Sequence, residues 1–373
     1  MNLVFWHNLI SPHQAPYMRA LAENGHDILL VASEDISPHR RQMGWAVPDL
    51  GSAQVVLDPD PGKVDEIVRN STPDAIHFIA GARGTPLGGI ALHACREHKR
   101  RTGIVTESPD PRSWKGALRK SKYAIERLRA GSHFDFLLCM GEKGIRWFKE
   151  CGYPESVLFP FAYVTDRATA TRSDFSDNSS GGGFRIIYVG QLIPRKGVDF
   201  LIKAFARAAI ADARLLIVGT GPSEKELRSL STMLGIDESM DWIGNKSADE
   251  IPELMAGADM MVLPSREDGW GAVVNESLMV GTPVICSDAC GAAELIRHPW
   301  LGGVFRSGDV AQLATLLRDW SVRKSNNTIE HGKIQTWTQC IEGRSVAGYV
   351  EDIMEHVYGS GARPVAPWRK DSI

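Results

Sequence analysis

Short apolar runs alternate with more polar segments along most of the chain. Such runs, bounded by Gly and Pro, are typical of strands buried on both faces of a parallel sheet. Helix stop signals such as Gly25 end several of the segments between them. In the first half we expect strands at 2–6, 26–32, 55–57, 75–80, 103–106 and 136–140, and helices at 15–24, 63–70, 88–100, 117–130 and 144–151. The alternation predicts an α/β fold with parallel sheets and right-handed crossovers.

A polar stretch at 165–183 separates two such halves and ends in serines and three glycines, which is the composition of a flexible linker. The second half predicts strands at 184–190 and 260–264, a strand and turn over 214–222, and helices at 198–209, 248–256, 272–280 and 309–323. We therefore expect one domain over 1–164, the linker over 165–183, a second domain over 184–334 and a final segment over 335–373. That segment contains an apolar helical stripe at 346–358, and we expect its end, from 359 on, to fray.

The loop before the 272–280 helix has the strongest candidate chemistry. It follows a buried strand and contains Asp268, Gly269 and Gly271. Open α/β sheets bind ligands at the carboxyl ends of their strands, and the glycines let a ligand approach the backbone. Glu276 lies about two helical turns further on, on roughly the same side. An ordinary helix N-terminus with a capping acid is the alternative interpretation.

The segment Asp268-Gly269-Trp270-Gly271, followed by Glu276, resembles the acid-x7-acid signature of retaining GT-B glycosyltransferases of family 4, the glycosyl transferases group 1. The usual form has Glu in place of Asp268, Phe in place of Trp270 and Ala in place of Ser277. The resemblance is strong over residues 184–300 and only topological over the first half.

Three further loops extend this resemblance. The segment from Gly190 to Gly197 is similar to the family's Gly-Arg-…-Lys-Gly loop, with Gln191 in place of the usual Arg but with Arg195 and Lys196 present. The turn that begins at Gly219 resembles the family's Val-Gly-x-Gly-Pro turn, and the loop around Ile243 resembles the one that contacts the nucleotide base. The implied donor-binding residues are Gly190, Gln191, Arg195, Lys196, Gly219, Ile243, Asp268, Gly269, Trp270, Gly271, Ala272, Val273 and Glu276.

The resemblance implies a GT-B fold, in which two Rossmann-like doubly wound domains face a central cleft and the C-terminal helix crosses back to the first domain. It implies that Arg195 and Lys196 hold the donor's diphosphate. Asp268 and the N–H groups of 269–273 would orient the sugar, and Glu276 would hold the ribose hydroxyls. The departing phosphate would accept the acceptor's proton, because no protein nucleophile is evident.

The loops of the first half suggest an acceptor site. Ser11, His13 and Gln14 follow the first strand and suit hydrogen bonds to sugar hydroxyls, although capping of the first helix is an equal alternative. Arg83 lies in the loop after 75–80. Glu107 follows 103–106, where family members often have a His facing the sugar; a carboxylate there could contact a hydroxyl or stabilise positive charge at the anomeric carbon. We therefore place Glu107 among the catalytic residues, with Arg195, Lys196, Asp268 and Glu276.

The stretch from Arg112 to Arg129 has seven Lys or Arg residues against one acid, with apolar residues interleaved. It predicts either a solvated helix face or a surface helix that meets anionic lipid or a phosphorylated acceptor. The net charge of -3 gives no general attraction to nucleic acid. No apolar run approaches membrane-spanning length, and the start of the chain lacks signal-peptide features.

The remaining composition suggests no metal or cofactor. The six cysteines form no zinc set and are expected to be reduced, as in a cytoplasmic protein. The segment Asp58-Pro59-Asp60 resembles a metal-binding Asp-x-Asp but lies in a proline-rich turn. We expect a cytoplasmic enzyme, and the basic stretch suggests peripheral attachment to the inner face of the plasma membrane.

The expected activity is transfer of a sugar from a nucleotide-sugar donor, UDP-sugar favoured over GDP-sugar, to a hydroxyl of a glycan or lipid-linked acceptor. Two alternatives remain open. A nucleotide-dependent oxidoreductase would use similar domains, but Glu224 replaces the third glycine of its fingerprint. A sugar-binding regulator without catalytic activity would be compatible with the substituted first acid.

Overall fold

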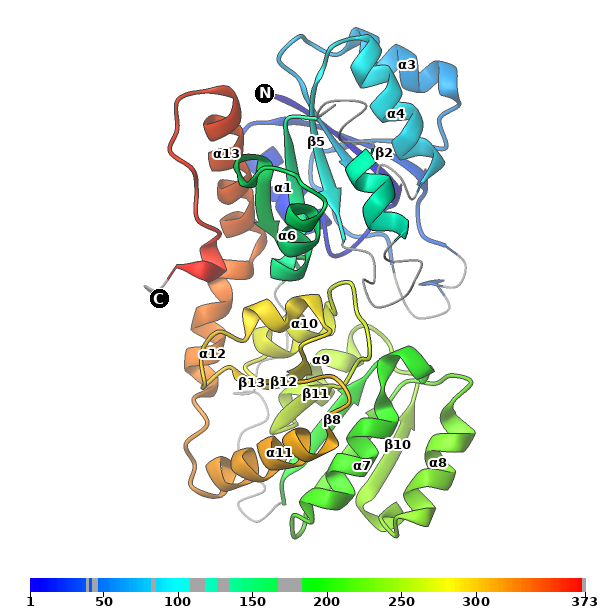
Figure 1. Ribbon diagram of the computed structural model, residues 1–373, viewed down its shortest axis with the longest axis vertical. Helices are drawn as coiled ribbons and strands as arrows, with labels where there is room; N and C mark the ends of the chain where they lie inside the picture. Colours follow the sequence, from blue (N-terminus) through cyan, green and yellow to red (C-terminus); the bar gives the residue numbers. More distant parts are fainter. Residues whose placement is uncertain are drawn as a thin grey trace. The chain divides into compact units, whose positions relative to one another are not determined.

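The computed structural model describes residues 1–37, 40–41, 46–81, 85–107, 118–125, 134–166 and 183–370. The chain divides into two compact units, Met1–Asp166 with Cys340–Ile373, and Arg167–Gln339. Each unit has a parallel sheet with helices packed on it (Figure 1). The expected fold class, α/β with two doubly wound domains and a C-terminal helix that returns to the first, is confirmed.

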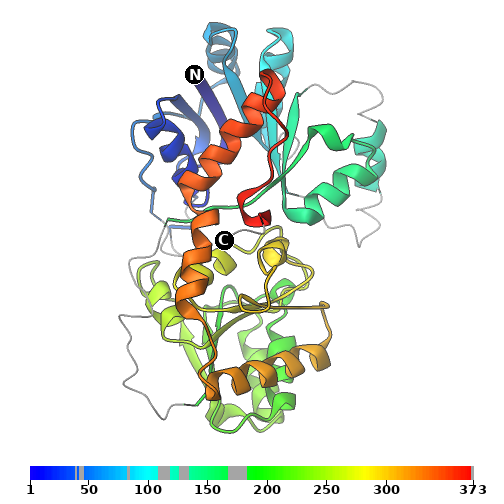
Figure 2. The same ribbon diagram turned by 90° about the vertical axis from the view of Figure 1, so that its left-hand side faces the viewer.

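The sheet of the first unit has seven parallel strands in the order β3-β2-β1-β4-β5-β6-β7. The strands are β1 (Asn2–Leu9), β2 (Asp27–Glu34), β3 (Gln54–Leu57), β4 (Ile76–Ala80), β5 (Arg101–Thr106), β6 (Phe136–Met140) and β7 (Leu158–Phe161). The helices are α1 (Ala15–Glu23), α3 (Pro61–Asn70), α4 (Pro86–Glu97), α6 (Gly141–Glu150) and α13 (Gly343–Tyr358), and residues 118–125 are also helical. Helix α1 packs against α13, and α3 packs against α4 (Figure 2).

Alternate residues of β1 point to opposite faces of this sheet. Val4 and Trp6 belong to the apolar core that also includes Val64 of α3 and Ala91 of α4. On the other face, the ring of Phe5 lies 6.0 Å from that of Tyr17 in α1. Both faces are therefore covered, which explains why most positions of the central strands β1, β4 and β6 are apolar.

Strand β7 was not expected from the sequence. It contains Pro160, and proline removes a ladder hydrogen bond. The strand lies at the edge of the sheet and pairs only with β6 among the named strands, so proline is tolerated there. Its carboxyl end leads directly to Tyr163, which matters for the site described below.

The end of the chain also differs from the expectation of fraying, because residues 359–370 pack on the first unit. Trp368 is 1% exposed and lies edge-on to Tyr349 of α13, with ring centroids 5.8 Å apart. Arg363 donates a hydrogen bond of 2.9 Å to the carbonyl of Ser156 and stacks 4.3 Å above the ring of Phe159. These contacts, rather than the composition of the tail, determine its order.

The second unit has six parallel strands in the order β10-β9-β8-β11-β12-β13. The strands are β8 (Arg185–Val189), β9 (Arg214–Val218), β10 (Met240–Gly244), β11 (Met260–Leu263), β12 (Val284–Ser287) and β13 (Gly302–Phe305). The helices are α7 (Val198–Ala208), α8 (Glu224–Met233), α9 (Glu250–Ala256), α10 (Val273–Met279), α11 (Val310–Ser325) and α12 (His331–Trp337). Because β9 lies on one side of β8 and β11 on the other, the winding reverses between β8 and β11. Ligands of such sheets bind outside the carboxyl ends of the strands at this position.

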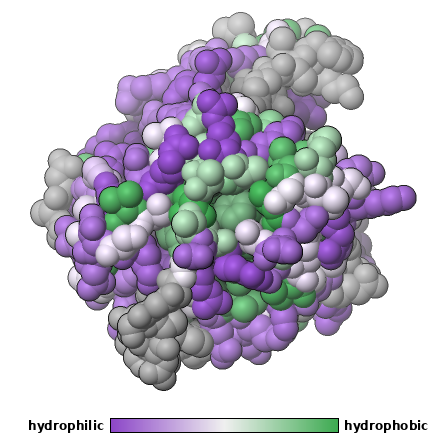
Figure 3. Space-filling model, turned by 90° about the horizontal axis from the view of Figure 1, so that it is seen from below, coloured by the Kyte–Doolittle hydropathy of each residue, from purple (hydrophilic) through white to green (hydrophobic). Residues whose placement is uncertain are grey.

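The surface is mixed in polarity. Figure 3 shows one face on which apolar residues gather near the centre and hydrophilic residues surround them. Within the described ranges, no helix is both long and apolar enough to cross a bilayer.

Candidate functional site

Two loops at the carboxyl edge of the second sheet pack closely on each other. They follow β8 and β9, and Leu192 donates its backbone N–H to the carbonyl of Thr220 at 2.9 Å. Gly219 has a φ of +125°, and a Cβ there would lie 2.0 Å from the carbonyl oxygen of Gly190. Only glycine fits this approach, which explains the Gly219 that the sequence singled out.

The loop after β8 then forms a single 3-10 turn, Pro194–Lys196, which ends at Gly197. Gly197 is left-handed, with a φ of +65°, and a Cβ there would lie 2.2 Å from the carbonyl oxygen of Pro264. The turn is therefore pressed against the end of β11, which places Arg195 and Lys196 beside the loop that contains Asp268.

Lys196 and Asp268 form a mostly buried ion pair. The Nζ atom lies 2.6 Å from Oδ2 of the carboxylate, and the two side chains are 15% and 11% exposed. Ser265 donates its hydroxyl to the same oxygen at 3.3 Å. Arg195 lies at the other side, with Nη1 3.8 Å from Oδ1 and 2.9 Å from the carbonyl of Glu267. Two cations and one carboxylate thus converge at the point where the strand order reverses.

The backbone around Asp268 is held by the loop after β12. Asp268 donates its N–H to the carbonyl of Ala289 at 3.1 Å, and Cys290 donates its thiol to the carbonyl of Trp270 at 2.7 Å. A Cβ on Gly291 would lie 2.2 Å from the carbonyl oxygen of Gly269. The chain that follows β12 therefore holds residues 268–271 in place.

The side chain of Trp270 is part of the core. It is 1% exposed, and its indole N–H donates to Oδ1 of Asn275 at 2.8 Å. Any contact of Trp270 with a ligand is therefore left to its main chain. This buried pair also connects the loop to the first turn of α10 and so orients the helix that contains Glu276.

Glu276 is half-buried on α10. Burial raises the pKa of its carboxyl from the ordinary 4.5 to about 7. In the described part of the chain, no residue forms a hydrogen bond or an ion pair with this carboxylate. Because a desolvated carboxylate without donors is costly, the group is suited to accept hydroxyl hydrogen bonds from a ligand.

The other predicted donor residues lie along the same edge. Gln191 accepts a hydrogen bond of 2.8 Å from the Tyr188 hydroxyl through its carbonyl, and Gly219 donates to the carbonyl of Gly244 at 2.8 Å. Ile243 was expected in a loop but lies half-buried within strand β10, whose end is thereby brought next to the Gly219 turn. Ala272 and Val273 begin α10 directly after Gly271.

In the first unit, the carboxyl edge of the sheet brings together a group that the sequence predicted only in part. Tyr163 donates its hydroxyl to Oε1 of Glu107 at 2.5 Å, and its ring lies 5.7 Å from that of His13. Burial, and secondly the charge of Arg40, lower the pKa of His13 to about 4, so that the imidazole is neutral at pH 7. Burial, followed by the nearby Glu107, raises the pKa of Tyr163 well above its usual value, so that it remains a donor. The sequence analysis did not single out Tyr163 or Arg40. For Tyr163 the available signal was its place as an aromatic residue just after an apolar run at 158–161.

The remaining acceptor-side residues have different outcomes. Ser11 accepts the backbone N–H of His13 at 3.3 Å. Gln14 is the N-cap residue of α1 but makes no side-chain capping hydrogen bond, so its side chain does not serve the capping alternative. Its Oε1 is buried without a partner among the residues that the structure describes. Arg83 lies outside the described residues.

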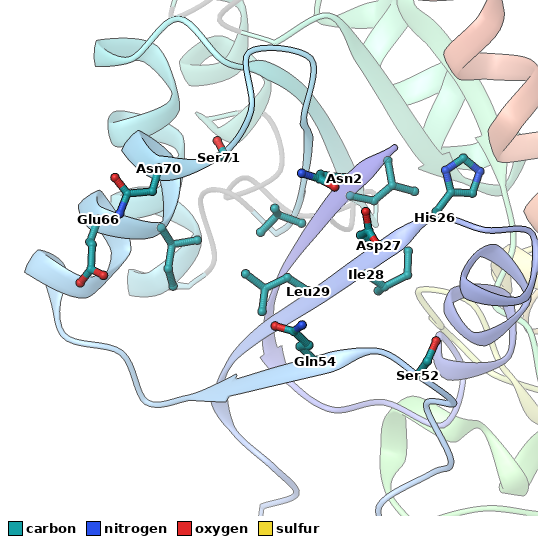
Figure 4. Close-up of a pocket in the computed structure, with 13 residues that line it drawn as sticks. Asn2, His26, Asp27, Ile28, Leu29, Ser52, Gln54, Glu66, Asn70 and Ser71 are labelled. Atoms are coloured by element: carbon teal, nitrogen blue, oxygen red, sulfur yellow. The ribbon is translucent and has the colours of Figure 1, made fainter.

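A pocket of about 490 Å³ lies at the opposite edge of the first sheet. Figure 4 shows Asn2, Asp27 and Gln54 at the amino ends of β1, β2 and β3, with Glu66 and Asn70 of α3 nearby. The described residues among those predicted to bind the acceptor follow the carboxyl ends of β1 and β5, at the other edge of this sheet, so this pocket is separate from them.

The described residues contain no group of three or more His, Cys, Asp or Glu side chains placed to hold a metal ion. Asp60, from the Asp-x-Asp segment, instead caps α3 by accepting the N–H of Lys63 at 2.8 Å. The six cysteines are buried and form no disulfide.

Glu276 gives a prediction for stability. Between pH 4.5 and 7 the folded protein retains a proton that the unfolded chain releases, so the free energy of unfolding should fall as pH rises through this range. Glu276→Gln should remove this slope and be more stable than the wild type above pH 7, by about 3 kcal/mol at most. Urea unfolding of both proteins from pH 5 to 8 measures this.

Glu250→Gln is the control, because hydrogen bonds from Lys246 and Ser247 lower the pKa of Glu250 to about 2, outside the range. Parallel wild-type and Glu276→Gln curves would contradict the raised pKa.

Comparisons with known proteins identify the family. The family model for glycosyl transferases group 1 matches residues 170–333, which contain the Lys196–Asp268 pair and Glu276. A GDP-mannose-dependent monoacylated alpha-(1-6)-phosphatidylinositol monomannoside mannosyltransferase of Corynebacterium glutamicum is 30% identical over an alignment of 269 residues, which covers 68% of this chain and 68% of the relative. A GDP-mannose-dependent alpha-(1-6)-phosphatidylinositol monomannoside mannosyltransferase of Mycobacterium tuberculosis is 33% identical over 138 residues, 35% of this chain and 36% of the relative.

A solved structure of similar fold is that of HepE from Anabaena in complex with UDP. It superposes with a TM-score of 0.73 at 18% identity and covers 95% of this chain and 100% of the other. At this identity the likeness concerns the fold alone. With the C. glutamicum relative matched over two thirds of its length, the family is clear: this chain belongs to the glycosyl transferases group 1, and it is a GT-B glycosyltransferase that uses nucleotide-sugar donors.

Proposed function

We propose that this enzyme transfers a hexose, with retention of anomeric configuration and without a metal ion, to a hydroxyl of a glycan or lipid-linked acceptor. The observation that supports it most is the convergence of Arg195, Lys196 and Asp268 at the carboxyl edge between β8 and β11. The names of the C. glutamicum and M. tuberculosis relatives specify phosphatidylinositol mannoside acceptors, which is why a lipid-linked acceptor is included.

Lys196 and Arg195 stabilise the departing diphosphate in this proposal. An ammonium group has three N–H donors, and Asp268 uses one of them in the ligand-free protein. Lys196 can therefore bind a phosphate oxygen while Asp268 keeps its Nζ atom in place. Negative charge on the diphosphate grows as the glycosidic bond breaks, so this contact strengthens towards the transition state.

Asp268 and Glu276 accept hydrogen bonds from hydroxyl groups of the donor. Oδ2 of Asp268 is bound by Lys196 and Ser265, so Oδ1 is the oxygen that faces a sugar hydroxyl. Glu276 accepts hydrogen bonds from the ribose hydroxyls. These hydrogen bonds favour the charged carboxylate and bring its pKa down from about 7. The backbone N–H groups of 269–273 complete the sugar contacts.

The acceptor binds to the first unit through Ser11, His13, Gln14 and Arg83. Glu107 keeps one oxygen for a sugar hydroxyl while the other accepts from Tyr163. His13 is neutral at pH 7 and is a hydrogen-bonding group rather than a charge. The leaving phosphate accepts the proton of the attacking hydroxyl.

The donor is a nucleoside diphosphate hexose. The sequence favoured a UDP-sugar, whereas the names of both relatives specify GDP-mannose, which we place first. A panel of UDP- and GDP-sugars, assayed for release of the nucleoside diphosphate, is the direct experiment. We expect turnover with GDP-mannose and an α-linked product from its α-linked sugar. Turnover with UDP-sugars alone would reverse the donor choice, a β-linked product would contradict retention, and no turnover with any of them would contradict the proposed donor class.

The leaving-group assignment predicts different effects on binding and on turnover. Lys196→Ala should reduce turnover at saturating donor by a larger factor than it raises the dissociation constant of the nucleoside diphosphate. Arg195→Lys should also lose turnover, because the planar guanidinium is lost while the charge is kept. Lys225→Ala, an exposed lysine on α8, is the control. Turnover at the wild-type level in both site variants would remove this basic pair from the leaving-group role.

The basic stretch from Arg112 to Arg129 is proposed to contact anionic lipid. Only 118–125 of it is described, as a helix in which Leu118 and Ile125 are 59% and 47% exposed. Lys120 pairs with Glu150 and lies 5.2 Å above the ring of Trp147, so Arg119 and Lys122 are the more available charges.

Cosedimentation with vesicles tests this contact. The wild type should bind phosphatidylserine vesicles more than neutral ones and be released by salt, since screening weakens surface charge interactions. Replacing Arg119 and Lys122 by Glu should abolish binding. Replacing Arg96 and Lys99 by Glu, two exposed basic residues at the end of α4, should reduce it far less. Equal binding to neutral vesicles, or none to either kind, would make the stretch a solvated helix face.

A further inference from the structure

Arg266 connects the loop after β11 to the turn after β8. Its Nη1 atom donates to the carbonyl of Pro194 at 2.8 Å, and its two terminal nitrogens bind the carboxylate of Asp199 at 2.7 and 2.8 Å. Its backbone N–H donates to the carbonyl of Arg195 at 2.8 Å. The guanidinium carbon also lies 3.9 Å above the ring of Phe200. One side chain therefore contacts residues on both sides of Arg195 and Lys196.

We propose that Arg266 is a positioning residue, which holds the Pro194–Lys196 turn where Arg195 and Lys196 meet the donor's diphosphate. This inference rests on the proposed function, because it assumes that the turn binds a diphosphate. Resemblance to the family motif did not single out Arg266, which lies two residues before its first acid.

The turn needs such support because it is short. A single 3-10 turn has poor hydrogen-bond geometry and little stability of its own. Gly197 fixes its end against Pro264, and Arg266 fixes its start through Pro194. Bidentate binding to Asp199 holds the guanidinium in one orientation, which a lysine ammonium could not reproduce.

Arg266 acts through geometry rather than charge. Burial favours the protonated form of Asp199, but the hydrogen bonds and charge of Arg266, aided by Lys203, lower the pKa of this carboxyl overall. Asp199 is therefore charged at neutral pH and balances the guanidinium. The pair adds little net charge near the diphosphate. The variant that lacks both side chains therefore leaves the net charge there unchanged, and its effect should come from the placement of Arg195 and Lys196.

The chain offers a matched control for a variant of Arg266. Arg214, at the start of β9, pairs with Asp241 through Nε at 3.0 Å and donates to the carbonyl of Glu238 at 2.9 Å. It has the same chemistry and similar exposure, 46% against 39%, but lies at the amino edge of the same sheet. Arg214→Met and Arg266→Met therefore both remove a guanidinium–carboxylate pair, and only the second one lies at the turn.

The first measurement is the ratio of the affinities for a nucleoside diphosphate and the corresponding monophosphate, with UDP against UMP and GDP against GMP. Arg266→Met should lower this ratio by about tenfold or more, the value expected when contacts to a charged group are lost. Arg214→Met should leave it unchanged, and Arg266→Lys should not restore it. Asp199→Ala should behave like Arg266→Met, with the double variant no worse than either single one. An unchanged ratio in Arg266→Met would overturn the positioning role, even if the variant is less stable.

The second measurement needs no nucleotide. Amide hydrogen exchange of the ligand-free proteins should be faster over 193–200 in Arg266→Met than in the wild type, and unchanged there in Arg214→Met. Equal exchange in all three proteins would overturn the inference. If the wild-type protein does not prefer diphosphate to monophosphate, the proposed donor site fails instead, and the exchange result alone decides whether Arg266 holds the turn.

Discussion

The ion pair between Lys196 and Asp268 joins two loops that lie 72 residues apart in the sequence. It can form only because the strands that precede these loops, β8 and β11, are neighbours in the sheet. The pair holds the Lys196 ammonium at the carboxyl edge and leaves two of its three N–H groups for a ligand. Glycines at positions 197, 219 and 271 let the surrounding loops approach closely enough for this contact. The proposed donor site is therefore a consequence of sheet topology combined with a few glycines.

The first unit shows a similar arrangement, because the loops after β5 and β7, which have β6 between them in the sheet, bring Glu107 and Tyr163 together. The two units differ in the charge they present. The second unit offers two cations that suit a diphosphate. At the edge of the first unit, Arg40 is the charge near His13, and the neutral His13 and the tyrosine bound to a carboxylate suit hydroxyl groups. This division agrees with an enzyme that takes a charged donor and an acceptor with sugar hydroxyls.

Local patterns were enough to predict the fold, because parallel α/β units repeat the same apolar run, turn and helix. The predicted fold class is confirmed, and most expected elements lie within a few residues of the observed ones. Strand β7 was missed because Pro160 argues against a strand unless its place at the sheet edge is known. The tail was expected to fray because burial of Trp368 depends on a surface that the tail's own sequence does not reveal.

Side-chain partners were the least predictable feature: the sequence placed Lys196 on the diphosphate and Asp268 on the sugar but could not pair them. It likewise gave no reason to connect Arg266 with Asp199. The roles of the site residues stay predictions.

A crystal structure of the protein with GDP or UDP bound is the most direct measurement of the central claim. The diphosphate should lie at the carboxyl edge between β8 and β11, with an oxygen within hydrogen-bond distance of Lys196 Nζ and the ribose hydroxyls on the carboxylate of Glu276. A nucleotide bound elsewhere on the sheet, or one that leaves Lys196 paired with Asp268 alone, would contradict the proposal that this ion pair is the core of the donor site.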